Sequence, residues 1–186
     1  MFSQNRFAQF KLFLAAAVLS LLNMGSATAA TGPQIDQSAE AALKFLYEGS
    51  PGAKALADKA KGILIFPDVV KAGFIVGGQG GDGKLIKNGK TAGYYNTAAA
   101  SVGLQAGAQS FGYVIFFMSD AVLKSFEKSK GWEIGVGPNV VIVDAGAAKD
   151  INTLTTKADI YAIIFDQKGL MAGVGIQGSK ITKISR

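Results

Sequence analysis

The chain has 186 residues, of which 49% are hydrophobic and 17% charged, and its formal net charge at neutral pH is +6. This length and composition are typical of one globular domain with its own hydrophobic core. Cysteine and histidine are both absent, which excludes disulfides, thiolate nucleophiles, Ser-His and Cys-His catalytic pairs and the usual zinc ligands. We therefore expect neither enzymatic activity nor a metal or other cofactor.

Residues 1–30 have the pattern of a secretory signal peptide. Two basic residues precede an apolar run over residues 12–22, and small residues follow up to Ala29 and Ala30. The apolar run is shorter than the roughly 20 residues that a transmembrane helix needs. We expect cleavage near Ala29 or Ala30 and export to the periplasm or cell envelope, with an uncleaved membrane anchor as the alternative.

The part of the chain that follows predicts two helices. Apolar residues recur at helical spacing from Ile35 to Tyr47. Ser50 and Pro51 then supply an N-cap and a proline at the first helical position, which together predict the start of a second helix that runs through Lys59.

The rest of the chain has mostly the pattern of β-strands. Asn88-Gly89 is the strongest hairpin signal, since both positions of such a turn need positive φ. Residues 63–66 and 69–76 are apolar and broken at Pro67-Asp68, and residues 77–83 read as a glycine-dense loop. The other predicted strands span residues 84–87, 90–96, 101–108, 111–118, 133–136, 140–143, 160–165, 170–176 and 180–184, with a helix from Ser119 or Asp120 to Lys130 after the fourth and a turn at 166–169.

These elements predict an α+β fold in a single domain, residues 31–186. Its core would be a glycine-rich, mostly antiparallel, curved or barrel-like sheet with N-terminal helices and one mid-chain helix. Residues 111–118 would place apolar side chains on both faces of a strand, which is typical of a central strand buried on both sides.

Several glycines recur at even spacing within the predicted strands. Side chains alternate between the faces of a strand, so these glycines would line one surface together. Glycine inside a strand marks a bulge, a tight bend or the close approach of another backbone. The pattern predicts strong curvature with tight packing or, alternatively, a groove for an acyl chain or a partner's backbone. The glycines are Gly103, Gly107, Gly135, Gly137, Gly173 and Gly175.

Motifs that resemble nucleotide-binding loops lack the context that such loops need. Residues 78–83 and 173–178 fit G-x-G-x-x-G, and the first stretch also fits the P-loop spacing, but no helix is predicted after either. Leu85 stands where a P-loop has the Ser or Thr that binds magnesium. We predict no nucleotide site. Among the carboxylates only Asp144, directly after an apolar run, is a candidate for chemistry, and turn capping is the competing interpretation.

The lysines gather in three places along the chain. Helices that carry lysines beside an apolar stripe can lie on an anionic membrane, where each basic residue near the surface contributes about 1 kcal/mol. The alternative is a solvated basic face. Nucleic acid is not expected as a partner, because the excess of positive charge is small and the protein is expected to be exported. The three groups are Lys54, Lys59 and Lys61, then Lys84, Lys87 and Lys90, then Lys124, Lys128 and Lys130.

Spaced segments between Lys61 and Ile184 resemble the SYLF domain. The opening pattern is AKG-hydrophobic-FP at residues 60–67, KAGF at 71–74 and VGG-x-GG-x-G at 76–83. Further segments that resemble the family in the same order are GYYN at 93–96, ASVGLQAG at 100–107, FFM at 116–118, WEIGV at 132–136 and KGLMAG at 168–173.

The resemblance implies a protein without enzymatic activity. In eukaryotic members it implies phosphoinositide binding, sometimes with actin binding, through basic residues and an amphipathic helix at the N-terminal side of the domain. The export signal and the lack of an SH3 domain argue against phosphoinositides and actin here, so an anionic bacterial phospholipid is the expected partner. The alternative is a periplasmic structural or interaction protein that binds a protein partner or itself. The expected lipid-binding residues are Lys44, Lys54, Lys59, Lys61, Lys84 and Lys87.

Overall fold

The computed structural model describes residues 29–136, 140–150, 158–169 and 175–186. The chain divides into a short N-terminal unit, residues 1–30, and the domain Thr31–Arg186 that carries the elements below. The predicted signal peptide lies almost entirely outside the described residues, and so does most of the strand predicted at 170–176.

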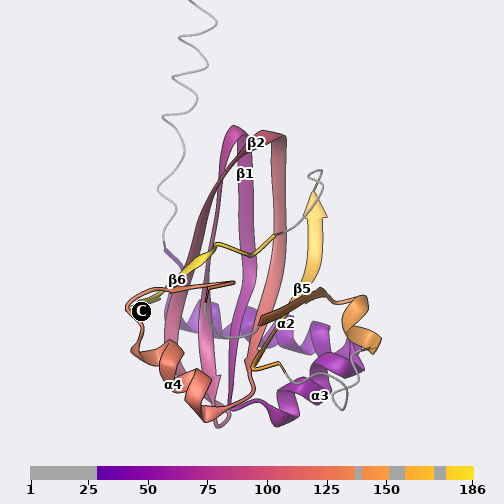
Figure 1. The fold of residues 1–186 in the computed structure, drawn as a ribbon, viewed down its shortest axis with the longest axis vertical. Coiled ribbons are helices and arrows are strands. Elements are labelled where there is room, and N and C mark those ends of the chain that lie inside the picture. The colour runs from indigo at the N-terminus through magenta and orange to yellow at the C-terminus, as the bar shows by residue number, and fades with distance from the viewer. Residues whose placement is uncertain (1–28, 137–139, 151–157, 170–174) are drawn as a thin grey trace, which may run out of the picture. The chain divides into compact units, whose positions relative to one another are not determined.

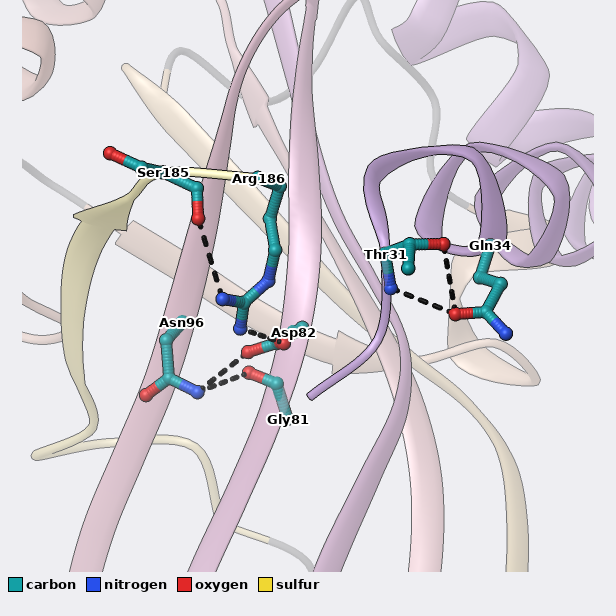
Figure 2. Close-up of polar contacts among 7 residues, drawn as sticks. All are labelled: Thr31, Gln34, Gly81, Asp82, Asn96, Ser185 and Arg186. Carbon is teal, nitrogen blue, oxygen red and sulfur yellow. Dashed lines mark hydrogen bonds and ion pairs between the residues drawn. The ribbon is translucent and has the colours of Figure 1, made fainter. Parts of the chain in front are cut away.

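Two helices open the domain where they were predicted. Helix α2 spans Gly32–Gly49 and helix α3 spans Pro51–Lys59. At the start of α2, the side-chain oxygen of Gln34 accepts hydrogen bonds from the backbone N–H of Thr31 (2.8 Å) and from its hydroxyl (2.9 Å), as Figure 2 shows. At the start of α3, the Ser50 hydroxyl accepts from the Ala53 backbone N–H at 3.4 Å, so Ser50 is the N-cap that the sequence predicted.

One long ribbon occupies the region for which several short strands and a glycine loop were predicted. Strand β1 (Gly62–Lys87) pairs antiparallel with strand β2 (Lys90–Phe117) along its length. Asn88 and Gly89 form the turn between them with φ of 52° and 72°, which confirms the predicted hairpin. The prediction of a loop at 77–83 was wrong, because these residues continue β1 and pair with β2. Pro67-Asp68 makes a bulge in the pairing rather than a break.

The ribbon folds back on itself halfway along. Figure 1 shows β1 and β2 doubled over, so that the turn at 88–89 returns to the end of the domain where β1 begins. At the fold, a Cβ on Gly73 would lie 2.9 Å from the Val76 carbonyl oxygen. On the way back, a Cβ on Gly83 would overlap the carbonyl oxygen of Ile65. The two halves of β1 can approach this closely only because these positions have no side chain.

In the described residues, six strands form one sheet, with the order β3-β6-β2-β5-β4 and with β1 paired to β2. All pairs are antiparallel except β4 and β5, which are parallel. The predicted α+β class, with a mostly antiparallel curved sheet, N-terminal helices and one mid-chain helix, is confirmed. The remaining elements are α4 (Asp120–Lys128), β3 (Trp132–Glu133), β4 (Val140–Asp144), η1 (Ala147–Asp150), β5 (Ile160–Gly169) and β6 (Lys180–Ile184).

Some boundaries differ from the sequence expectation. Helix α4 begins after the predicted cap, Ser119, whose hydroxyl accepts from the Val122 N–H at 3.4 Å, but it ends at Lys128 rather than Lys130. Strand β5 continues through the turn predicted at 166–169, with Asp166 at a φ of 51°. Strand β6 has the predicted bounds.

A hydrophobic core lies on each face of the sheet. Tyr113, Ile115 and Phe117 of β2 face one core, whereas Val114 and Phe116 face the other, which confirms a central strand buried on both sides. Helix α4 covers the first core, where the ring of Phe126 lies 4.9 Å from Phe117 and 5.7 Å from Trp132, measured between centroids. Helices α2 and α3 cover the second core with Ala39, Leu43, Leu46, Ala53 and Leu56.

Two of the glycines predicted to line one surface of the strands, Gly135 and Gly175, do not lie in strands. Gly135 lies in a turn with φ of 93°, and Gly175 lies outside the strands, with no atom within 4 Å of the place of its Cβ. Gly137 and Gly173 lie outside the described residues. Close backbone packing does occur, but at Gly73, Gly81 and Gly83 of β1.

Candidate functional site

Members of the three lysine groups, which are far apart in the sequence, lie at one end of the domain. Figure 1 shows α3, α4 and the turn between β1 and β2 at this end. Next to Lys61, a Cβ on Gly62 would lie 2.8 Å from a methyl group of Leu123, so the start of β1 packs against α4. The ammonium of Lys87 lies 3.0 Å from a carboxylate oxygen of Glu127, which joins the ribbon to the same helix.

We call this region the basic end and define it by six lysines. Five of them are exposed, and Lys87 is half-buried beside Glu127. On α4, Lys124 and Lys128 are four residues apart and therefore lie on the same side of the helix. The buried residues of α4, Leu123 and Phe126, attach that helix to the core, so the position of its lysines is fixed by packing. The six are Lys59, Lys61, Lys87, Lys90, Lys124 and Lys128.

Two of the predicted lipid-binding residues are exposed but have an acidic neighbour one helical turn away. Lys44 lies 3.9 Å from Glu48 on α2, and Lys54 forms an ion pair with Asp58 on α3. Exposed pairs of this kind contribute only about 0.3–0.5 kcal/mol to stability. The acidic partners nevertheless offset the local positive charge at Lys44 and Lys54, as Glu127 does at Lys87.

Lys84, also predicted to bind lipid, is buried beneath α2. Its ammonium lies 3.0 Å from Asp36 and 3.5 Å from Glu40, and 4% of its side chain is exposed. Asp36 also accepts hydrogen bonds from the hydroxyls of Tyr94 (3.0 Å) and Thr91 (3.1 Å). Lys84 therefore ties α2 to the ribbon, and we do not include it in the basic end.

The surroundings of Asp36 lower the pKa of its carboxyl group. Desolvation raises this pKa, but the hydrogen bonds from Lys84, Tyr94 and Thr91, together with the charge of Lys84, outweigh that effect and hold it below its usual value of 3.8. Asp36 is thus a carboxylate at neutral pH, as its ion pair with Lys84 requires.

A second polar cluster fixes the C-terminal residue to the ribbon, as Figure 2 shows. The guanidinium of Arg186 lies 2.6 Å from a carboxylate oxygen of Asp82. Asn96 donates to the other oxygen of Asp82 at 2.8 Å and to the Gly81 carbonyl at 3.2 Å. Sequence reasoning did not find this cluster, because Asp82 and Arg186 are 104 residues apart and no local pattern connects them.

Asp144, the carboxylate that the sequence singled out as a candidate for chemistry, has a structural role. Asp144 accepts a hydrogen bond from the Ala147 N–H at 2.8 Å, so it caps η1, in line with the turn-capping interpretation.

An apolar hollow of about 250 Å³ lies between α2, β5 and the turn that follows β4, and it is lined in part by Phe45, Phe165 and Asp166. No group of three or more acidic residues in the described parts of the chain could hold a metal ion. No helix among the same residues is both long and apolar enough to cross a membrane.

Comparison with known proteins points to the same family as the sequence motifs. Residues 98–185 match the Ysc84 family model, which is described as Las17-binding protein actin regulator. The chain is also 31% identical to Beta cell expansion factor A of Aeromonas veronii over 150 residues, which cover 78% of this chain and 54% of that protein. The chain thus spans about half the length of this curated relative. The SYLF resemblance is confirmed, because residues 98–185 match the model of the Ysc84 (SYLF) family.

Proposed function

We propose that this protein is an exported, non-enzymatic domain that binds anionic phospholipid at the cell envelope through its basic end. The observation that carries the proposal is the convergence of lysines from α3, the β1–β2 turn and α4 on one end of the fold. The family match adds support, because the SYLF resemblance implies lipid binding without catalysis. The predicted signal peptide, residues 1–30, is the basis for the proposed location.

The charge at the basic end supports reversible membrane attachment as the proposed mode of binding. Each basic residue near an anionic surface contributes about 1 kcal/mol, and the attraction falls off within a Debye length, about 8 Å at physiological ionic strength. Because α3, α4 and the turn are attached to one packed core, their lysines can meet a surface together without a change of fold. Binding should therefore be strong at low salt and weak at high salt.

The family description names Las17 and actin, but we propose lipid as the partner of this chain. An exported protein would not meet actin, and the lysines of the basic end fit headgroup phosphates by charge alone. A protein-interaction domain without lipid affinity is the competing function. Binding of a protein partner that does not change with salt, together with no affinity for vesicles, would favour it.

Vesicle co-sedimentation tests the proposal directly. Neutral vesicles are compared with vesicles that contain phosphatidylglycerol or cardiolipin, at low and high salt. The double variant Lys61→Glu/Lys128→Glu reverses two charges of the basic end, and Lys44→Glu/Lys168→Glu reverses two exposed lysines elsewhere. We expect salt-sensitive binding to anionic vesicles only, at least tenfold weaker in the first variant and little changed in the second. Equal losses in the two variants would mean that net charge, not the basic end, drives binding.

A further inference from the structure

Strand β4 lies at one edge of the sheet. It is the last strand in the order β3-β6-β2-β5-β4, and among the described residues it pairs only with β5. Edge strands are commonly protected from other chains by charged side chains, proline or a bulge. Residues 140–143 of β4 have no charge and no proline, and their pairing with β5 has no register shift. The edge therefore lacks the usual features that keep another strand away.

One hydrogen bond shows which backbone groups of β4 point to this edge. The Ala145 N–H, directly after the strand, donates to the Ile164 carbonyl of β5 at 2.8 Å. Backbone groups point alternately to the two sides of a strand, so those of Val140, Ile142 and Asp144 point away from β5. No backbone hydrogen bond on that side joins them to a described residue. Such a row of N–H and C=O groups is matched by the backbone of another β-strand.

The edge is complementary to itself. In an antiparallel pair centred on Ile142, the two copies of this residue lie opposite each other and exchange both N–H···O=C bonds. Val140 then lies opposite Asp144 of the second copy and forms the same kind of pair. The two carboxylates are at opposite ends of the paired strands, so no like charges face each other. This is the isologous contact of a twofold-symmetric dimer.

Pairing at this edge would also cover apolar surface on both faces of the sheet. Val140 and Ile142 pack at the margin of the first core, and Val141 and Val143 at the margin of the second. All four side chains are only half-buried. A strand added beside them removes part of the remaining apolar surface from water, which favours association.

The apolar hollow adjoins the same edge. Ala145 and Gly146, directly after β4, line it together with Phe45 of α2, which is 56% exposed. In the antiparallel pair, the N-terminal end of β4 of the second copy arrives beside Ala145. A five-residue edge alone is small beside the total of about 1,200 Å² that stable interfaces bury, so the hollow and Phe45 supply apolar area that the interface needs.

We propose that the edge of β4 and the adjoining hollow form a homodimer interface, in which β4 of each copy extends the sheet of the other. A second copy fits because its own edge supplies the matching backbone groups and the same uncharged apolar residues. An extended peptide of another protein is the competing occupant. The interface does not use the basic end, so dimerisation and vesicle binding can be tested separately.

Sedimentation equilibrium of the full chain over a range of concentrations tests the interface. We expect a monomer–dimer equilibrium that changes little with salt, because backbone hydrogen bonds and apolar contacts are not screened. Ile142→Lys places two ammonium groups side by side at the twofold axis and should raise the Kd of the dimer by about tenfold or more. Ile142→Glu should do the same with two carboxylates. The matched control is Val70→Lys, at an exposed apolar residue of β1, which should dimerise like the natural protein.

Mixing the two charged variants keeps the test independent of folding defects. An equimolar mixture of Ile142→Lys and Ile142→Glu pairs opposite charges at the axis and should restore the dimer, which misfolded variants could not do. Phe45→Ser should weaken the dimer severalfold, and an unchanged Kd would remove the hollow from the interface. The proposal is overturned if Ile142→Lys dimerises normally or if the mixture stays monomeric. A natural protein that is monomeric at every concentration also overturns it and leaves the edge to an extended peptide of another protein.

Discussion

Lys84 and Lys71 are buried lysines of the same strand, and their surroundings differ in one respect. Around Lys84 the protein supplies two carboxylates, Asp36 and Glu40, from a helix that packs on the ribbon. Around Lys71 the described residues supply none, and the facing Gln109 is itself without a partner. Lys84, whose two carboxylates come from a packed helix, holds that helix to the ribbon, whereas the ammonium of Lys71 is not among the buried atoms without a partner and has no such role.

The largest expected effect comes from forcing apart the two halves of the doubled strand β1 that carries both lysines. In Gly83→Ala the new methyl group would overlap the Ile65 carbonyl oxygen and lie 2.6 Å from the ring of Phe66. The backbone must move apart, and we expect a loss of about 3 kcal/mol in the free energy of unfolding, measured by urea denaturation. Gly78→Ala is the matched control on the same strand, because its nearest contact is 3.7 Å away. A similar loss in both variants would show that the cost comes from strand glycines in general.

The next effect distinguishes Lys84 as an internal tether. Lys84→Met keeps most of the buried apolar volume but leaves Asp36 without its cation. Because Asp36 is partly exposed and keeps the hydroxyl donors of Tyr94 and Thr91, we expect a moderate loss of about 2 kcal/mol. If Lys84→Met were as stable as the natural protein, the ion pair between Lys84 and Asp36 would make no net contribution to the free energy of unfolding.

The same substitution at Lys71 should have the opposite sign. Lys71 is mostly buried and forms no ion pair with a described residue, so replacing it by an apolar side chain in Lys71→Met should cause no loss of stability or a gain of up to about 1 kcal/mol. Chemical denaturation measures the free energy of unfolding beside that of Lys84→Met. A loss equal to that of Lys84→Met would remove the difference between the two lysines.

Acid unfolding should give a smaller effect, which measures the contribution of Asp36 and its ion pair with Lys84. The pKa of Asp36 is lowered in the folded state, so its contribution to stability is present above the unfolded value near 3.8 and is lost as the pH falls through the folded value. Stability measured between pH 5 and pH 2 should therefore decline less steeply in Asp36→Asn than in the natural protein. Parallel curves for the two proteins would assign the acid sensitivity to other carboxylates.

The smallest effect is expected where a lysine and its partner are both exposed. Lys54→Ala breaks the pair with Asp58 on the surface of α3 and should change the free energy of unfolding by less than about 0.5 kcal/mol. A change of more than 1 kcal/mol would mean that exposure to solvent does not reduce what a lysine ion pair contributes to stability.

The features that sequence reasoning predicted well are those with local causes. Ser50-Pro51 starts a helix and Asn88-Gly89 makes a hairpin turn because of the chemistry of neighbouring residues. The loop prediction at 77–83 failed because Gly81 and Gly83 pack against Asp68 and Ile65, which lie 13 and 18 positions earlier in the chain, and periodicity gives no signal for such a contact.

The candidate site shows the same limit. The lysines were found, but their arrangement was not, because it depends on contacts between α4 and the ribbon. In the sequence, Lys84 resembles its neighbour Lys87. The two differ only because α2 packs over Lys84, and its partners on that helix, Asp36 and Glu40, lie more than 40 residues earlier in the chain. Lys71 and Gln109 likewise become a pair only through the register of β1 and β2.

The doubled ribbon also has a consequence for the order of folding events. The pairs nearest the turn, such as Lys87 with Lys90, close the shortest loops, and each later pair along the strands requires its neighbour to be in place. Closing short loops first costs the least chain entropy, so we expect the hairpin to form outward from Asn88-Gly89. The contact between Gly83 and Ile65 can form only when both halves of β1 have formed, so we expect the ribbon to fold back on itself late. Substitution of Gly83 should therefore change the rate of unfolding more than the rate of folding.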